Sequence, residues 1–221
     1  MRLSDRLIFL GDSITKFGER PQGYVWLIEQ KLTGKQPNRQ VELIKAGISG
    51  NKVTALQERL ERDVLDQKPN LVFVYIGIND VWHWTIHGNR DKGTTKDDFE
   101  AGLNDIITRI QNSGAAVVLA TLTVIGEKPN GANANDAMLD AYADISRRVA
   151  KEKGVVLCDL RAAFTDYLKS YNAELQLDSG ILTVDAVHLT DRGNRLVANC
   201  AAASIAQALR QRNERTVART R

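Results

Sequence analysis

The chain has 221 residues, of which 43% are hydrophobic, so it can bury a full core as one domain without metal or disulfide staples. Its formal net charge is +3, and the last ten residues carry four arginines and one glutamate, which leaves the rest of the chain near neutral. We therefore expect one domain over residues 1–211 and a basic, solvated tail over residues 212–221. The tail is short and lacks aromatic residues, so we expect no nucleic-acid partner.

The N-terminal apolar run is too short for a signal peptide, and no stretch approaches the roughly 20 apolar residues of a membrane span. These features predict a cytoplasmic protein with no membrane partner. Cys158 lies in a strand-like run and Cys200 in an alanine-rich, helix-like run. Both are predicted to be buried free thiols.

Five short apolar runs along the chain predict strands. They are rich in β-branched residues and leucine and lack polar alternation, which is typical of strands buried on both faces. In chain order the runs are 7–10, 41–44, 71–76, 116–122 and 155–158.

Segments between these runs predict amphipathic helices, because apolar residues recur every three or four positions and form one stripe. The stripes are Val53, Leu56, Leu60 and Val64; Phe99, Leu103, Ile106 and Ile110; and Met138, Tyr142, Ile145 and Val149. Gly114 and Gly154 stand where two of these helices should end, and Thr190 stands where a last helix should begin.

Strands that alternate with helices imply a three-layer α/β/α sandwich around a five-stranded parallel sheet. Functional residues in such a sheet gather at the carboxyl ends of the strands. Two long polar connections, 84–96 and 123–135, are predicted to be binding loops or lids.

A serine follows the first predicted strand, in the sequence Gly11-Asp12-Ser13. At a strand end it would face solvent close to backbone N–H groups that favour negative charge. Taken alone, these residues are more typical of a helix cap formed by Asp12 or Ser13.

Asp185 and His188 lie three residues apart near the C-terminus. On one turn the carboxylate can hold the Nδ1–H group while Nε2 faces a nucleophile, as in a catalytic triad. The alternative is a histidine that caps or packs at the start of the last helix. The chain has only three histidines, so few other candidate bases exist.

Two further polar segments follow the second and third predicted strands. The first contains Gly47 and Gly50, and the second contains Gly77, Asn79 and Asp80. Glycine lets backbone N–H groups approach a ligand closely, and an asparagine amide can donate to a developing oxyanion. Each segment alone is also typical of an ordinary strand-to-helix turn.

Together, the four segments resemble the GDSL/SGNH hydrolase family in residue type, order and position. Three matching blocks are Gly11-Asp12-Ser13, Gly77-Ile78-Asn79-Asp80 and Asp185-Ala186-Val187-His188. The glycine of the remaining block matches Gly50 better than Gly47, and Ala46 departs from the asparagine that family members often have there. The blocks span nearly the whole chain.

The resemblance implies a flavodoxin-like fold and a serine esterase that needs neither metal nor cofactor. It assigns Ser13 as the nucleophile, with Asp185 and His188 to activate it. The oxyanion hole would consist of the N–H groups of Ser13 and Gly50 and the side-chain amide of Asn79.

Asp12 is expected to shape the turn around Ser13, and we group it with Trp82 and Trp84 as substrate-binding. The tryptophans follow the oxyanion block and are predicted to stack on a sugar or wall an acyl pocket, although packing beneath the long loop is the alternative. His83 and His87 could chelate a metal on a helix, but no carboxylate or cysteine cluster accompanies them, so we expect no metal.

The expected substrate is a short-acyl ester, such as an acetyl group on a carbohydrate or small alcohol. A thioesterase or lysophospholipase of the same family would need a longer apolar groove, and the polar loop 125–135 argues against one. A non-catalytic glycan-binding module would usually have lost one of the reactive residues. A nucleotide binder is disfavoured because no P-loop pattern occurs, and the lipase elbow Gly-x-Ser-x-Gly is also absent.

Overall fold

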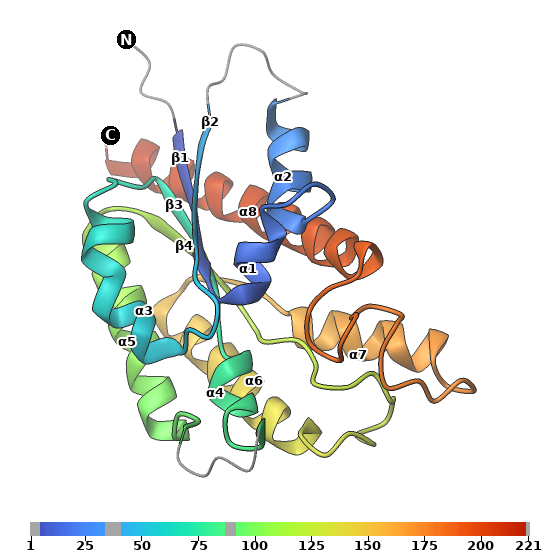
Figure 1. The fold of residues 1–221 in the computed structure, drawn as a ribbon. Helices are drawn as coiled ribbons and strands as arrows, with labels where there is room; N and C mark the ends of the chain where they lie inside the picture. The colour runs from blue at the N-terminus through green and yellow to red at the C-terminus, as the bar shows by residue number, and fades with distance from the viewer. Residues whose placement is uncertain (1–4, 34–40, 87–91, 220–221) are drawn as a thin grey trace.

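The computed structural model describes residues 5–33, 41–86 and 92–219, which form a parallel five-stranded sheet between two layers of helices (Figure 1). The strands lie in the order β2–β1–β3–β4–β5. They are β1 Asp5–Gly11, β2 Val41–Gly47, β3 Leu71–Tyr75, β4 Ala116–Ala120 and β5 Val156–Cys158. The predicted three-layer class is confirmed, and each predicted strand is present with ends shifted by at most three residues.

One face of the sheet carries the three helices whose apolar stripes the sequence predicts. They are α3 Val53–Leu60, which continues as a π-helical turn η1 Glu61–Leu65, then α5 Lys96–Asn112 and α6 Asp136–Lys153. Every stripe residue is buried except Met138, which is half-buried. The last two helices end beside Gly114 and Gly154, both with positive φ, as predicted.

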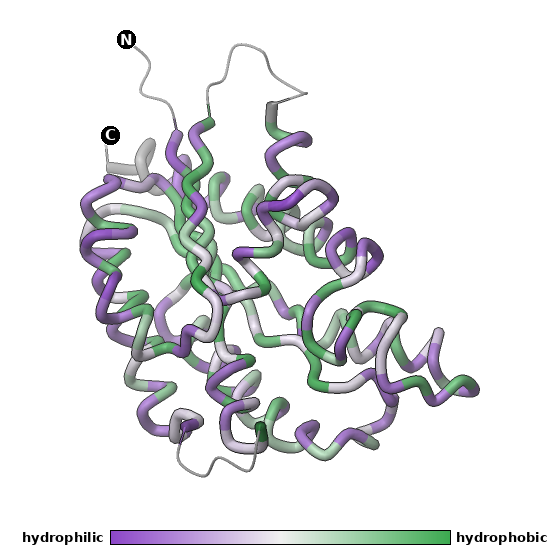
Figure 2. Tube along the Cα trace, in the orientation of Figure 1, coloured by the Kyte–Doolittle hydropathy of each residue, from purple (hydrophilic) through white to green (hydrophobic). Residues whose placement is uncertain are grey.

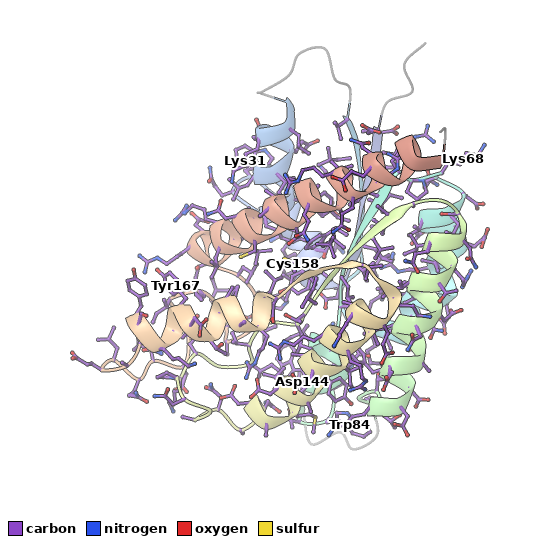
Figure 3. The ribbon with its side chains drawn as sticks, turned by 180° about the vertical axis from the view of Figure 1, so that it is seen from behind. Lys31, Lys68, Trp84, Asp144, Cys158 and Tyr167 are labelled. Atoms are coloured by element: carbon purple, nitrogen blue, oxygen red, sulfur yellow. The ribbon has the colours of Figure 1, made fainter. Side chains whose placement is uncertain are left out.

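The opposite face carries α1 Ser13–Gly18, α2 Tyr24–Thr33, α7 Leu160–Tyr171 and α8 Asp191–Arg219. Helix α8 crosses β3, β4 and β5, and Figure 3 shows it running over the sheet with Cys158 in the layer beneath. Thr190 caps it by accepting the Gly193 N–H, as predicted. The helix continues to Arg219, so the expected boundary at residue 211 falls inside a helix, and Arg212 pairs with Asp5.

The core lies against both faces of the sheet, where Figure 2 shows the hydrophobic stretches of the chain following the central strands. All five residues of β3 are buried, because helices cover it on both sides. Cys158 is buried and Cys200 half-buried, and both are free thiols, in agreement with the sequence prediction except for the partial exposure of Cys200. Among the described helices, none combines the length and apolarity needed to cross a bilayer.

The strand register places three chain segments level with one another at the carboxyl edge of the sheet. Gly11 at the end of β1 pairs with Gly47 of β2 on one side and with Tyr75 of β3 on the other. The chain order reverses at β1, since β2 lies on one side of it and β3 on the other. Ligands of such sheets bind at that switch point, so the region after these strand ends is the place to look for a site.

Gly47 is required by a close contact between the end of β2 and helix α1. A Cβ added there would lie 2.3 Å from the Lys16 backbone nitrogen, whereas one added at Gly114 would meet nothing within 4 Å. We expect Gly47→Ala to lower the free energy of unfolding by about 3 kcal/mol or more, since backbone must move. Gly114→Ala should cost only about 1–2 kcal/mol, from its positive φ alone. Urea denaturation of the two variants tests this, and equal losses would contradict the packing argument.

Candidate active site

Ser13 is the first residue of α1 and follows β1 after one intervening residue. Asp12 caps this helix, because its Oδ1 accepts the Ile14 N–H at 2.9 Å. The Ser13 side chain therefore sits at the carboxyl edge of the sheet, and its own N–H lies in the first helical turn, where backbone N–H groups have no partner within the helix. The helix-cap interpretation of this segment is met by Asp12, whereas the role of Ser13 as nucleophile stays a prediction.

Asp185 and His188 lie on the loop that joins α7 to α8, and this loop returns to the same edge of the sheet (Figure 1). The Asp185 carboxylate accepts the backbone N–H groups of Val187 and His188 at 3.1 and 2.7 Å. Its other oxygen lies 2.7 Å from His188 Nδ1. The turn that makes this possible has Ala186 at φ +74°, a conformation that L-residues rarely adopt.

A continuous hydrogen-bond chain joins the three predicted catalytic residues. His188 Nε2 lies 3.0 Å from Ser13 Oγ, across 175 residues of sequence, while Nδ1 faces Asp185. Partial burial raises the pKa of Asp185, but hydrogen bonds from the side chain and backbone of His188 outweigh it and hold that pKa below 3.8. The carboxylate is thus ionised over the neutral range and can stabilise an imidazolium.

The two glycines considered for the oxyanion hole have different environments. Gly47 is pressed against the backbone of α1, which explains its identity by packing alone. Gly50 is exposed, has φ +78°, and its N–H has no acceptor among the described residues. This favours Gly50 as the donor, which stays a prediction.

Asn79 lies in α4 Ile78–Trp82, directly after β3, and is buried. One proton of its amide is donated to the Asn51 carbonyl at 3.0 Å, so the second is available to a ligand. Asp80 accepts the Val53 N–H at the start of α3, so it ties the segment that carries Asn79 to its neighbour.

Arg59 is a buried cation that sequence reasoning missed, and it connects three segments of the site. It donates to the carbonyls of Gly11 and Ala46 at 2.9 Å each, and to Asn51 Oδ1 at 2.8 Å. Asp63 balances its charge at 2.8 Å. One feature of the sequence could have indicated this role. Arg59 lies beside the apolar stripe of α3, and a charged side chain that is buried there needs polar partners.

Aromatic rings flank His188. The Phe17 ring centroid lies 5.0 Å and the Trp82 centroid 6.5 Å from the imidazole centroid. Trp82 is therefore next to the reactive groups, as expected of a substrate-binding residue. Phe17 was missed, although it lies four residues after Ser13 and thus on the same side of α1.

Trp84 and Asp12 have structural roles in place of the expected contact with substrate. The Trp84 ring packs on Gly93 and its Nε1 donates to the Thr94 carbonyl at 3.3 Å, which holds the connection between α4 and α5. Figure 3 shows it at the rim of the molecule, beside the ends of α5 and α6. Asp12 is only 2% exposed, so it serves as a cap beneath Ser13.

Two acids are buried beneath the reactive groups. Burial raises the pKa of Asp12 from 3.8 to about 7, with a further contribution from Asp80, while the Ile14 N–H and Arg59 oppose the rise. Burial also raises the pKa of Asp80 to about 6. Both acids are thus partly protonated near neutral pH.

Of the two candidate metal ligands, His83 and His87, only His83 lies among the described residues. His83 is half-buried, and burial together with Lys52 and Lys92 lowers its pKa below 6.5. In the described part of the chain, no group of three potential metal ligands is found.

The raised pKa of Asp12 predicts a pH-dependent stability. Between about pH 4 and 7 the folded chain holds a proton on Asp12 that the unfolded chain releases, so this group's stabilisation is complete below pH 4 and is lost as the pH rises through 7. The Asp12→Asn variant keeps a side-chain oxygen that can accept the Ile14 N–H, but its side chain does not titrate in this pH range. Above pH 8 it should exceed the wild type in unfolding free energy by up to roughly 4 kcal/mol, and the gap should shrink towards pH 4. Urea titrations from pH 4 to 8 measure the gap, and a constant gap would contradict the prediction.

Comparison with known proteins agrees with the fold. Residues 9–196 match the model of the GDSL-like lipase/acylhydrolase family. An acetylxylan esterase of Geobacillus stearothermophilus is 31% identical over 209 residues, which cover 88% of this chain and 90% of that protein. The solved structure of the acetyl xylan esterase AlAXEase superposes with a TM-score of 0.83 at 39% identity, covering 90% of this chain and 99% of that one. The structure of LAE5, an α/β hydrolase from the metagenome of Lake Arreo in Spain, gives a TM-score of 0.80 at 31% identity, over 92% and 96% of the two chains. The chain belongs to the GDSL-like lipase/acylhydrolase family.

Proposed function

We propose that the protein is a serine esterase that removes acetyl groups from acetylated carbohydrates, with xylo-oligosaccharides as the first substrates to test. The observation that carries the proposal is the hydrogen-bond chain from Ser13 Oγ through His188 to Asp185. The acetylxylan esterases to which the chain is similar over nearly its whole length supply the substrate class.

The geometry supports acylation and deacylation with one base. Ser13 Oγ attacks the ester carbonyl while His188 takes its proton and passes it to the leaving alcohol, and water then attacks the acyl-enzyme with His188 again as base. Asp185 holds the tautomer that leaves Nε2 free to accept the proton. The N–H groups of Ser13 and Gly50 and the Asn79 amide would donate to the oxyanion, where loss of one donor typically costs about 10²–10³-fold in rate.

A short acyl group suits the surroundings of Ser13. Phe17 lies close to His188 and limits the space on that side. An apolar hollow lined by Leu7, Leu71 and Ile205 lies at the amino ends of β1 and β3, so it does not extend the site into a groove for a long chain. These features favour an acetylesterase over a thioesterase or lysophospholipase.

The nucleophile assignment predicts the effect of Ser13→Ala. This variant should fold normally and lose at least about 10³-fold in kcat on p-nitrophenyl acetate, because the acyl-enzyme can no longer form. A fluorophosphonate probe should label the wild type and not the variant. A folded Ser13→Ala protein with full activity would refute the mechanism, and an unlabelled, inactive wild type would favour a non-catalytic glycan-binding module.

Acyl preference is tested with p-nitrophenyl esters from acetate to palmitate and with acetylated xylose. We expect activity to fall steeply beyond the shortest chains and acetate to be released from the sugar. Activity confined to long chains would overturn the acetylesterase proposal while leaving the triad intact.

Trp82 is expected to contact the sugar more than the acyl group. Trp82→Ala should raise KM for acetylated xylose about 2–10-fold, since an aromatic contact is worth about 0.5–1.5 kcal/mol. The KM for p-nitrophenyl acetate should change less, and Trp82→Phe should restore part of the loss. Equal changes with both substrates would exclude a sugar-specific contact.

A further inference from the structure

Glu127 is a fully buried acid with no cation partner among the described residues. It lies on the connection between β4 and α6, and its carboxylate accepts the backbone N–H groups of Ile181, Leu182 and Thr183 and the Thr183 hydroxyl. Three of these bonds measure 2.6–2.8 Å. The three backbone N–H groups can only donate, so the Glu127 oxygens accept a hydrogen bond from each of them.

The backbone beside this carboxylate holds the same segment at two further points. The Glu127 N–H donates to the Asp178 carbonyl at 3.0 Å, and the Gly126 N–H donates to the Ala186 carbonyl at 2.9 Å. Ala186 is the residue with φ +74° inside the Asp185–His188 turn. Gly126 and Glu127 thus hydrogen-bond to one loop at two places, at Asp178 near its start and at Ala186 in the strained turn.

Lys128 also pairs with Asp178 at the start of the loop at 3.0 Å, whereas the hydrogen bonds around the tip are local. Thr183 and Leu189 form a single antiparallel bridge, the Val184 N–H donates to the His188 carbonyl at 2.7 Å, and the Thr190 N–H donates to the Leu182 carbonyl at 2.9 Å. These bonds fix the shape of the tip but not its position relative to β1, which carries Ser13. Burial of Leu182 and Val187 in the core helps to set that position, and the bonds to Gly126 and Glu127 add directional anchors from outside the loop.

We propose that Glu127 is a positioning residue that places Asp185 and His188 against Ser13, an inference that rests on the proposed function. A buried carboxylate is costly unless its acceptors are fully used. Three successive N–H groups bound to one carboxylate orient the chain as well as hold it, which apolar packing does not do. The demand is strict, because a misplacement of about 1 Å at a catalytic group can cost on the order of 10²-fold in rate.

Glu127→Gln tests the proposal with little change of shape. Its amide nitrogen faces at least one N–H donor, so the segment from Ile181 to Thr183 must shift. We expect kcat on p-nitrophenyl acetate to fall about 10–100-fold, with KM within about threefold. The low-field proton resonance of His188 Nδ1–H in its bond to Asp185 should move or broaden. Thr183→Val removes one of the four bonds and should lower kcat about 2–10-fold.

Asp159→Asn is the matched control. It also exchanges a hydrogen-bonded carboxylate for an amide and loses the pair with Arg147, but the printed partners of the Asp159 carboxylate, Thr121, Arg147 and Ala162, lie outside the segment 178–190. It should lower Tm with kcat within twofold of the wild type and an unchanged His188 resonance.

The possible results distinguish a failure of the positioning role from a failure of the proposed function. A folded Glu127→Gln protein with kcat within twofold of the wild type, or a loss no larger than that of Asp159→Asn, overturns the positioning role. If Glu127→Gln does not fold, the Thr183→Val variant decides, and an unchanged kcat there overturns the role as well. A wild type that hydrolyses no ester refutes the proposed function, whereas the His188 resonance still reports whether Glu127 sets the loop.

Discussion

The site depends on the pairing of β1 with a neighbour on each side. Because Gly11 is level with both Gly47 and Tyr75, the segments that follow these residues leave the sheet together. Ser13, Gly50 and Asn79 each come two to four residues later, so the sheet brings the expected nucleophile and two of the expected oxyanion donors to one edge without any specific contact between their side chains. Arg59 then fixes the ends of β1 and β2 to the residue that holds Asn79.

The parts that the sequence predicts are those in which residue type and local order carry the information. Continuous apolar runs identify strands, and Ser13, Asn79, Asp185 and His188 have side chains suited to their chemistry. Arg59, Glu127 and Phe17 were missed because their roles come from contacts across 8 to 171 residues, such as those of Arg59 with Asn51 or Phe17 with His188. Trp84 was assigned to the substrate for its nearness to Asn79 in sequence, but the chain turns between them and its ring packs on Gly93.

The two acids buried beneath the reactive groups lower the free energy of unfolding when they are ionised. Asp12 and Asp80 are buried close enough to raise each other's free energy when ionised, and Asp80 Oδ2 has no hydrogen-bond partner among the described residues. Both residues set loops that carry reactive groups, Asp12 through Ile14 and Asp80 through Val53. Strain or unsatisfied polarity of this kind is tolerated where it fixes geometry that catalysis uses.

The 175 residues that separate Ser13 from His188 have a consequence for the time at which activity arises. During synthesis Ser13, the proposed nucleophile, emerges with the first strand, whereas His188, its proposed base, follows only after all five strands have been made. A nascent or partly folded chain therefore displays a serine that the proposed base has not yet activated. On the proposed mechanism hydrolysis requires the loop that carries His188 to reach Ser13, so the onset of turnover during refolding reports the docking of that loop.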